Sequence, residues 1–218
     1  MIVFLLACLV FLILQKFVEP KERRVIVTSH FKEDLSWLKK AKWDVVVIDH
    51  KGSAPSAIKP LAVIPNRGRE ASSYLKYILD NWDNLPDYVA FIHGHEDAWH
   101  HFKGPLLPII ENTDLEPGMY TSLNYIFGQP LNMKDSIQPY WGEWLGLGPL
   151  PKDPPCAPGA AQFIVARDRI LSRPKKLYQD MYDYIIDPHN DHYAIGCFYE
   201  YIWHYIFTHK WNMCVCET

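Results

Sequence analysis

The chain has 218 residues, a formal net charge of −3 and 49% hydrophobic residues. This length suits one compact domain with a substantial core. The sequence lacks a stripe of Lys and Arg interleaved with aromatic residues, so it carries no electrostatic footprint for nucleic acid, and we expect no nucleic-acid partner.

Residues 1–18 open with the unbroken apolar run MIVFLLACLVFLIL, and a charged linker, residues 19–24, follows. The run is short for crossing about 30 Å of hydrocarbon. No small-x-small cleavage signal follows it, so we interpret residues 1–18 as a membrane anchor or signal segment and prefer an uncleaved anchor. We expect a single-pass membrane protein of the secretory pathway, with the domain in the ER or Golgi lumen. Lys16 and the later cations follow the run, which by the positive-inside rule favours a cytoplasmic domain, so the orientation stays open.

Four cysteines lie outside the apolar run: Cys156, Cys197, Cys214 and Cys216. They could form two disulfides in a lumenal domain or stay free thiols in a cytosolic one. A structural zinc site on them is disfavoured, because no second Cys pair completes a zinc-knuckle spacing.

Short β-branched runs alternate with helical patterns along residues 25–210, which we expect to form the domain, and residues 211–218 form a C-terminal tail. The expected strands are 25–29, 44–48, 62–64, 88–92, 119–123 and 161–166. The expected helices are 33–42, 70–82, 105–111, 167–187 with a break at Pro174, and 191–208. A strand–helix–strand unit at the start implies parallel strands covered on both faces. The sequence therefore predicts an α/β fold: a single Rossmann-like domain with a mostly parallel sheet flanked by helices.

Metal-ligand residue types gather directly after the apolar strand 88–92: His93, His95, Asp97 and His100. Ligands of open α/β sheets bind at the carboxyl ends of strands. Imidazole favours Zn, Mn, Fe or Ni over Mg or Ca. We predict a divalent-metal site on His93, His95 and Asp97; the alternative is a hydrogen-bonded polar cluster without a metal.

Two further features suggest a site. The turn Asn66-Arg67-Gly68-Arg69-Glu70 precedes a helix, where backbone N–H groups and arginines can hold an anion, although it could equally be an N-terminal cap with solvated arginines. Glu200 and His204 lie four residues apart on the last helix, as either a surface ion pair or a buried catalytic pair.

A Pro-, Gly- and Trp-rich stretch covers residues 128–159. A stretch this long without regular structure is usually a lid or a binding loop. Trp141 and Trp144 within it could stack on a sugar or a base, or they could pin the loop to the body of the protein.

Four segments carry a resemblance to known proteins: NRGREASSYLKYI (66–78), LPDYVAFIHGHEDAWH (85–100), GAAQFIVARDRI (159–170) and EYIWHYIF (200–207). Together they resemble an uncharacterised family, a domain of unknown function found mainly in fungi and algae, over residues 25–208. The chain is more loosely similar to GT-A type glycosyltransferases. Those enzymes have a Rossmann-like half and then a strand that ends in an Asp-x-Asp metal motif, where this chain has His93-Gly94-His95-Glu96-Asp97.

The second resemblance implies a membrane-anchored, metal-dependent glycosyltransferase that takes a nucleotide-sugar donor and a glycan or protein acceptor. A divalent ion (Mn, Mg or Zn) on His93, His95 and Asp97 would neutralise the leaving diphosphate. The donor phosphates would be held by Asn66, Gly68, Arg69 and Glu70. Glu200 would be the general base, oriented by His204. The substrate cleft would be lined by Trp99, His100, Trp141, Trp144 and Gln162.

Two other functions stay open. One is a non-catalytic, membrane-anchored binding module whose polar cluster is a degenerate site. The other is a zinc-dependent hydrolase, because His93-x-His95-x-Asp97 is similar to the signature of metallo-β-lactamase-type hydrolases. That signature continues with a His directly after the Asp, where this chain has Ala98.

Overall fold

The structure is a computed structural model, and it describes residues 21–98, 100, 104–125, 141, 145–149 and 157–213. The strands are β1 (Arg24–His30), β2 (Asp44–His50), β3 (Ala62–Ile64), β4 (Tyr88–Ile92), β5 (Tyr120–Ser122) and β6 (Phe163–Ala166). The α-helices are α2 (Arg69–Asp80), α3 (Leu106–Glu111), α5 (Arg167–Leu171), α6 (Lys175–Ile186) and α7 (His192–Thr208), and the 3-10 helices are η1 (Ser36–Lys40) and η2 (Trp82–Asn84).

The six strands form one mixed, mostly parallel sheet in the order β3-β2-β1-β4-β6-β5. Strand β1 pairs in parallel with both β2 and β4, and β2 pairs in parallel with β3. Strand β6 runs antiparallel to both β4 and β5. The predicted α/β class is therefore confirmed, and the chain order reverses direction across the sheet between β1 and β4.

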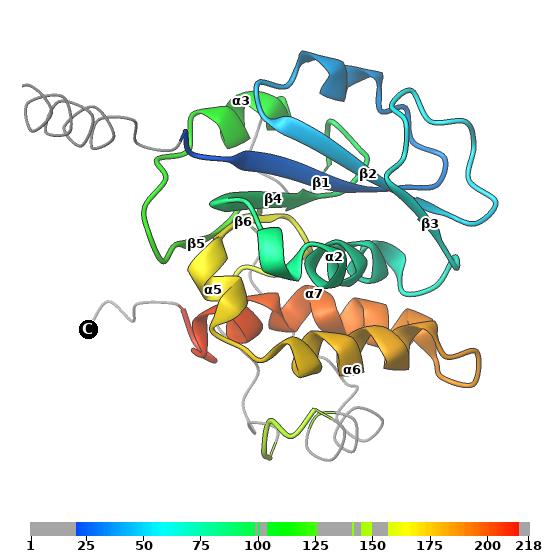
Figure 1. The fold of residues 1–218 in the computed structure, drawn as a ribbon, viewed down its shortest axis with the longest axis vertical. Coiled ribbons are helices and arrows are strands. Elements are labelled where there is room, and N and C mark those ends of the chain that lie inside the picture. The colour runs from blue at the N-terminus through cyan, green and yellow to red at the C-terminus, as the bar shows by residue number, and fades with distance from the viewer. Residues whose placement is uncertain are drawn as a thin grey trace, which may run out of the picture.

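Helices cover both faces of the sheet (Figure 1). Helices α2, α5, α6 and α7 lie on one face, and η1 and α3 lie on the other. Alternate residues of each central strand divide between the two cores: in β4, Val89 and Phe91 face the α2–α7 side, whereas Ala90 and Ile92 face the η1–α3 side. Both faces being covered explains why β4 is apolar at every position rather than at every second one.

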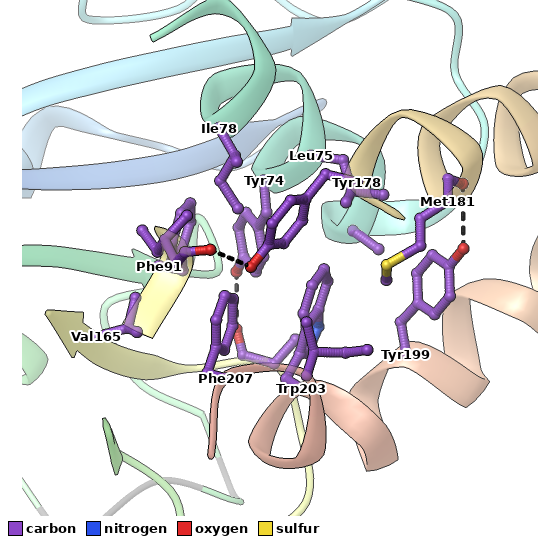
Figure 2. Close-up of a cluster of buried hydrophobic side chains, with 14 of the residues drawn as sticks. Tyr74, Leu75, Ile78, Phe91, Val165, Tyr178, Met181, Tyr199, Trp203 and Phe207 are labelled. Carbon is purple, nitrogen blue, oxygen red and sulfur yellow. Dashed lines mark hydrogen bonds between the residues drawn. The ribbon is translucent and has the colours of Figure 1, made fainter. Parts of the chain in front are cut away.

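The larger core is aromatic, and backbone carbonyls accept hydrogen bonds from its buried tyrosine hydroxyls (Figure 2). The Tyr74 hydroxyl donates to Ala161 O at 2.8 Å, and the Tyr199 hydroxyl donates to Met181 O at 3.1 Å. Trp203 of α7 stacks on Phe207 with ring centroids 5.7 Å apart. The Trp203 ring centroid also lies 6.1 Å from that of Tyr74 in α2 and 5.8 Å from that of Phe163 in β6. Helix α7, which carries a residue of the candidate site, is therefore packed against both α2 and the sheet.

One predicted element differs. The segment expected as a helix over 33–42 contains only the five-residue 3-10 helix η1. The Asp34 carboxylate accepts a hydrogen bond from the backbone N–H of Ser36 at 2.8 Å, and the Glu33 carboxylate accepts from Phe31 and Lys32. Side-chain acceptors therefore take the N–H groups at the start of this segment and favour a turn over a longer helix.

Two sequence predictions concern the N-terminal segment and the cysteines. The predicted anchor over 1–18 lies outside the described residues, and no helix within the described part of the chain is long and apolar enough to cross a membrane. Cys197 is a free thiol. Cys156, Cys214 and Cys216 lie outside the described residues.

Candidate functional site

A cleft of about 720 Å³ opens at the carboxyl ends of β1, β2 and β4. It therefore lies beside the reversal of strand order between β1 and β4, which is where open α/β sheets bind their ligands. Its lining residues come from the ends of these strands, the start of α2 and the middle of α7: Ser29, Phe31, Glu33, His50, Asn66, Arg69, Glu70, His93, Gly94, His95, Asp97, Ala98, His100 and Glu200.

The start of α2 is pressed against α6 and α7. Gly68 has φ +75°, and a Cβ at this position would lie 2.3 Å from Ile185 Cδ1. A Cβ on Gly196 of α7 would lie 3.1 Å from the Gly68 carbonyl oxygen. Two glycines thus permit an approach that larger residues would block. This approach brings the first turn of α2 alongside the segment of α7 that carries Glu200.

Only part of the predicted phosphate-binding turn faces the cleft. Asn66, Arg69 and Glu70 line it. The Gly68 amide donates to His192 Nδ1 at 3.1 Å, so this N–H is already used within the protein. Arg67 donates to the carbonyl oxygens of Asp187 and Asn190, at 2.8 and 2.7 Å, and joins the turn to the end of α6.

Arg69 and Glu200 form an ion pair across the cleft between Nη1 and Oε1. The Arg69 backbone is left-handed, with φ +53°, an unusual value for a residue that bears a Cβ. Its side chain is 42% exposed, that of Glu200 is 19% exposed, and the guanidinium lies 5.2 Å from the centroid of the Tyr193 ring. Burial raises the pKa of the Glu200 carboxyl, and the Arg69 charge opposes that rise.

His204 has a different partner from the one predicted. Its Nε2 lies 2.8 Å from the Trp211 carbonyl oxygen, and the residue is 1% exposed and not among those that line the cleft. Glu200 and His204 do lie on one helix, as predicted, but the ion-pair partner of Glu200 is Arg69 of α2. The predicted role of His204 in orienting Glu200 is therefore not supported by a contact between the described residues.

Glu70 and His93 both line the cleft, and their side chains face each other and are mostly buried. Glu70 Oε1 lies 3.8 Å from His93 Nε2, which is too long for a hydrogen bond, and neither buried atom has a hydrogen-bond partner among the described residues. Burial, reinforced by the charge of Glu200, raises the pKa of the Glu70 carboxyl from 4.5 to about 8. Burial also lowers the pKa of the His93 imidazole from 6.5 to about 3. Burial therefore favours the neutral form of both groups.

The predicted metal ligands are distributed over the cleft. The His93 side chain is mostly buried, whereas the His95 side chain is 62% exposed and its Nε2 lies 3.9 Å from Glu33 Oε1. Asp97 lines the cleft. Within the described ranges, no three His, Cys, Asp or Glu side chains gather in a way that could hold a metal ion. The histidines each face a glutamate, so the described residues do not fit the three-ligand site that the sequence predicts.

Two predicted cleft residues lie in the interior instead. Gln162 is fully buried; its Oε1 accepts from the backbone N–H of His93 at 3.2 Å, and its Nε2 donates to Asn124 Oδ1 at 3.3 Å. Trp141 is also fully buried, with its ring 5.8 Å from that of Phe198. Both are corrections: Gln162 holds the exit of β4 in place, and Trp141 packs in the core because a ring this large gains more from burial than from exposure.

Of the three other residues predicted to line the substrate cleft, the structure describes only His100. His100 lines the cleft, and its Nδ1 lies 2.8 Å from Asn124 Oδ1. Trp99 and Trp144 lie outside the described residues.

Sequence reasoning missed three residues with polar side chains that line the cleft: Ser29, Glu33 and His50. Ser29 Oγ and Ser73 Oγ lie 2.9 and 3.1 Å from His50 Nε2. The position of Ser29 and His50 in the sequence could have identified them, because both stand at the carboxyl ends of the first two parallel strands.

Comparisons with known proteins give a family and no function. No curated protein and no solved structure matches the chain. A family model described as "Protein of unknown function (DUF3431)" matches residues 25–107 and 133–218, which include each residue of the cleft. Because this match covers most of the chain, the protein belongs to the DUF3431 family of proteins of unknown function.

Proposed function

We propose that this protein is a glycosyltransferase that binds a nucleotide-sugar donor in the cleft. The observation that carries the proposal is the position of the Arg69–Glu200 pair, a cation and a carboxylate side by side in a cleft at the reversal point between β1 and β4. The strand order β3-β2-β1-β4 is the same as the first four strands of the classic Rossmann order 3-2-1-4-5-6. The volume of about 720 Å³ is within the usual range for small-molecule sites.

Each group has a role that its chemistry suits. The Arg69 guanidinium stabilises the negative charge that develops on the leaving diphosphate. In an inverting reaction, the acceptor oxygen bonds to the anomeric carbon as the bond to the diphosphate breaks, and the Glu200 carboxylate takes the hydroxyl proton. Burial raises the pKa of Glu200, which makes its carboxylate a stronger base. No step here passes through a metal ion, because the described residues do not bring three ligands together.

Thermal shift with a panel of nucleotide-sugars tests the proposal, because a ligand stabilises only a state that it binds. We expect one class of nucleotide-sugar to raise the melting temperature of the wild type, and Arg69→Gln to abolish that shift. Adding EDTA or Mn²⁺ to the same samples reports whether binding needs a divalent ion. Release of free nucleoside diphosphate from the donor that stabilises the protein then tests for turnover. A panel that leaves the melting temperature unchanged in both conditions would count against the proposal.

A non-catalytic binding module is the second candidate. It is favoured by the engagement of Arg69 and Glu200 with each other rather than with open solvent. A nucleotide-sugar that stabilises the protein but is never turned over, with any acceptor, would support this candidate. The zinc hydrolase has less support, since His93, His95 and Asp97 do not gather into a ligand set.

A further inference from the structure

We propose that Glu200 is an internal competitor for the anion site on Arg69, so that a bound phosphate displaces the carboxylate from the guanidinium and releases Glu200 into the cleft. The identification of the ligand as a nucleoside diphosphate group rests on the proposed function. The competition itself does not, because any phosphate of sufficient charge would cause it.

The geometry of Arg69 supplies the first part of the argument. Its Nη1 donates to Glu200 Oε1, and both side chains line the cleft. Its other contacts are weaker: Nη1 lies 3.6 Å from Cys197 Sγ, and the guanidinium lies 5.2 Å from the Tyr193 ring centroid. The carboxylate is therefore the anion that a ligand has to replace.

The exposure of the Arg69 side chain favours the replacement of Glu200 as its partner. With 42% of the Arg69 side chain exposed, water screens its attraction to Glu200, and ion pairs of this kind contribute little to stability. A phosphate carries more charge than a carboxylate and accepts two parallel hydrogen bonds from one guanidinium. Arg69 also begins α2, and the N-terminus of a helix favours an anion. The balance therefore favours the phosphate once it is present.

Arg69 is the partner that moves. Glu200 stands on α7 between Tyr199 and Trp203, 0% and 1% exposed, whose burial holds that helix in the core. The Arg69 side chain is long and half exposed, so it can swing towards a ligand while Glu200 stays in place. After the swing, Glu200 is an unpaired carboxylate beside the bound phosphate. A general base released in this way becomes available only after the donor binds, which predicts that the donor binds before the acceptor.

The test is calorimetric titration of the full chain with inorganic pyrophosphate in EDTA, which separates Arg69 from any metal effect. We expect Glu200→Gln and Glu200→Ala each to bind pyrophosphate at least about ten-fold more tightly than the wild type, because each removes the competing charge. Arg69→Gln should abolish binding. Asp80→Asn is the matched control: it removes one carboxylate from an ion pair with Lys76 at the far end of α2, and it should leave the affinity within about two-fold of the wild type.

Each outcome is decisive. Unchanged or weaker pyrophosphate binding by both Glu200 variants would overturn the inference. An equal gain in pyrophosphate affinity from Asp80→Asn would also overturn it, and so would a complete lack of binding by every variant. Tighter binding by both Glu200 variants supports it, even if the wild type binds too weakly to measure. If the Glu200 variants gain affinity for pyrophosphate while no nucleotide-sugar stabilises the protein, the proposed function fails and this inference stands.

Discussion

Replacing Gly68 by Ala should destabilise the protein because of one backbone angle and one contact. The left-handed φ of +75° costs a residue with a Cβ about 1–2 kcal/mol. The new Cβ would lie 2.3 Å from Ile185 Cδ1, and overpacking of a core site typically costs about 1–3 kcal/mol more. We therefore expect a loss of about 2–5 kcal/mol in the free energy of unfolding, measured by urea denaturation.

Gly52→Ala is the matched control for this prediction. Gly52 has φ +86°, but a Cβ there meets nothing within 4 Å, so only the backbone cost of about 1–2 kcal/mol applies. A double-mutant cycle with Ile185→Ala isolates the contact: the double variant should be more stable than the sum of the two single losses predicts, by about 1–3 kcal/mol. Equal losses for Gly68→Ala and Gly52→Ala, with no coupling to Ile185, would refute the close packing of α2 on α6.

Three further predictions concern stability and pH. Because the pKa of Glu70 is raised from 4.5 to about 8, the folded protein holds a proton that the unfolded chain releases, and this group lowers stability by up to about 1.4 kcal/mol per unit as pH rises from 4.5 to 8. The lowered pKa of His93 raises stability with a similar slope between pH 3 and 6.5, so the wild type should show a net fall from about pH 6.5 to 8, and denaturation of Glu70→Gln at several pH values should lack this fall. His95→Ala should leave the unfolding free energy within about 0.5 kcal/mol of the wild type, because the side chain is 62% exposed; if this variant unfolds the domain, the residue is structural. Ile92→Ala should instead cost about 2–5 kcal/mol, because it opens a cavity in the core. Trp141→Ala should cost about 3–5 kcal/mol in the same assay, and a loss below about 1 kcal/mol would contradict its burial.

The elements of the fold were largely predictable because their signals are local. The expected strand 88–92 coincides with β4, and the break expected at Pro174 separates α5 from α6. Proline lacks the backbone N–H that a continuous helix needs, so this single residue is enough to predict the boundary. The helix expected over 33–42 fails for an equally local reason, since Asp34 and Glu33 bind backbone N–H groups with their side chains.

The partners within the site were not predictable, because they come from distant segments. Glu200 has a histidine four residues away in the sequence, but its ion-pair partner is Arg69, 131 residues away. That pairing depends on the approach of α7 to the start of α2, which Gly68 and Gly196 permit and which no periodicity reveals. Likewise, a histidine spacing of two suggested one metal site, whereas His93 and His95 face Glu70 and Glu33 from different elements.

The wide spacing of the cleft residues along the chain has a consequence for how the protein matures. The first lining residue is Ser29 and the last is Glu200, so no fragment that stops before α7 contains the complete site. During synthesis the early strands emerge well before the final helix, and Arg69 has no carboxylate from α7 until that helix docks. A nascent chain would therefore present Arg69 first and acquire the Glu200 carboxylate that pairs with it only once α7 has been made.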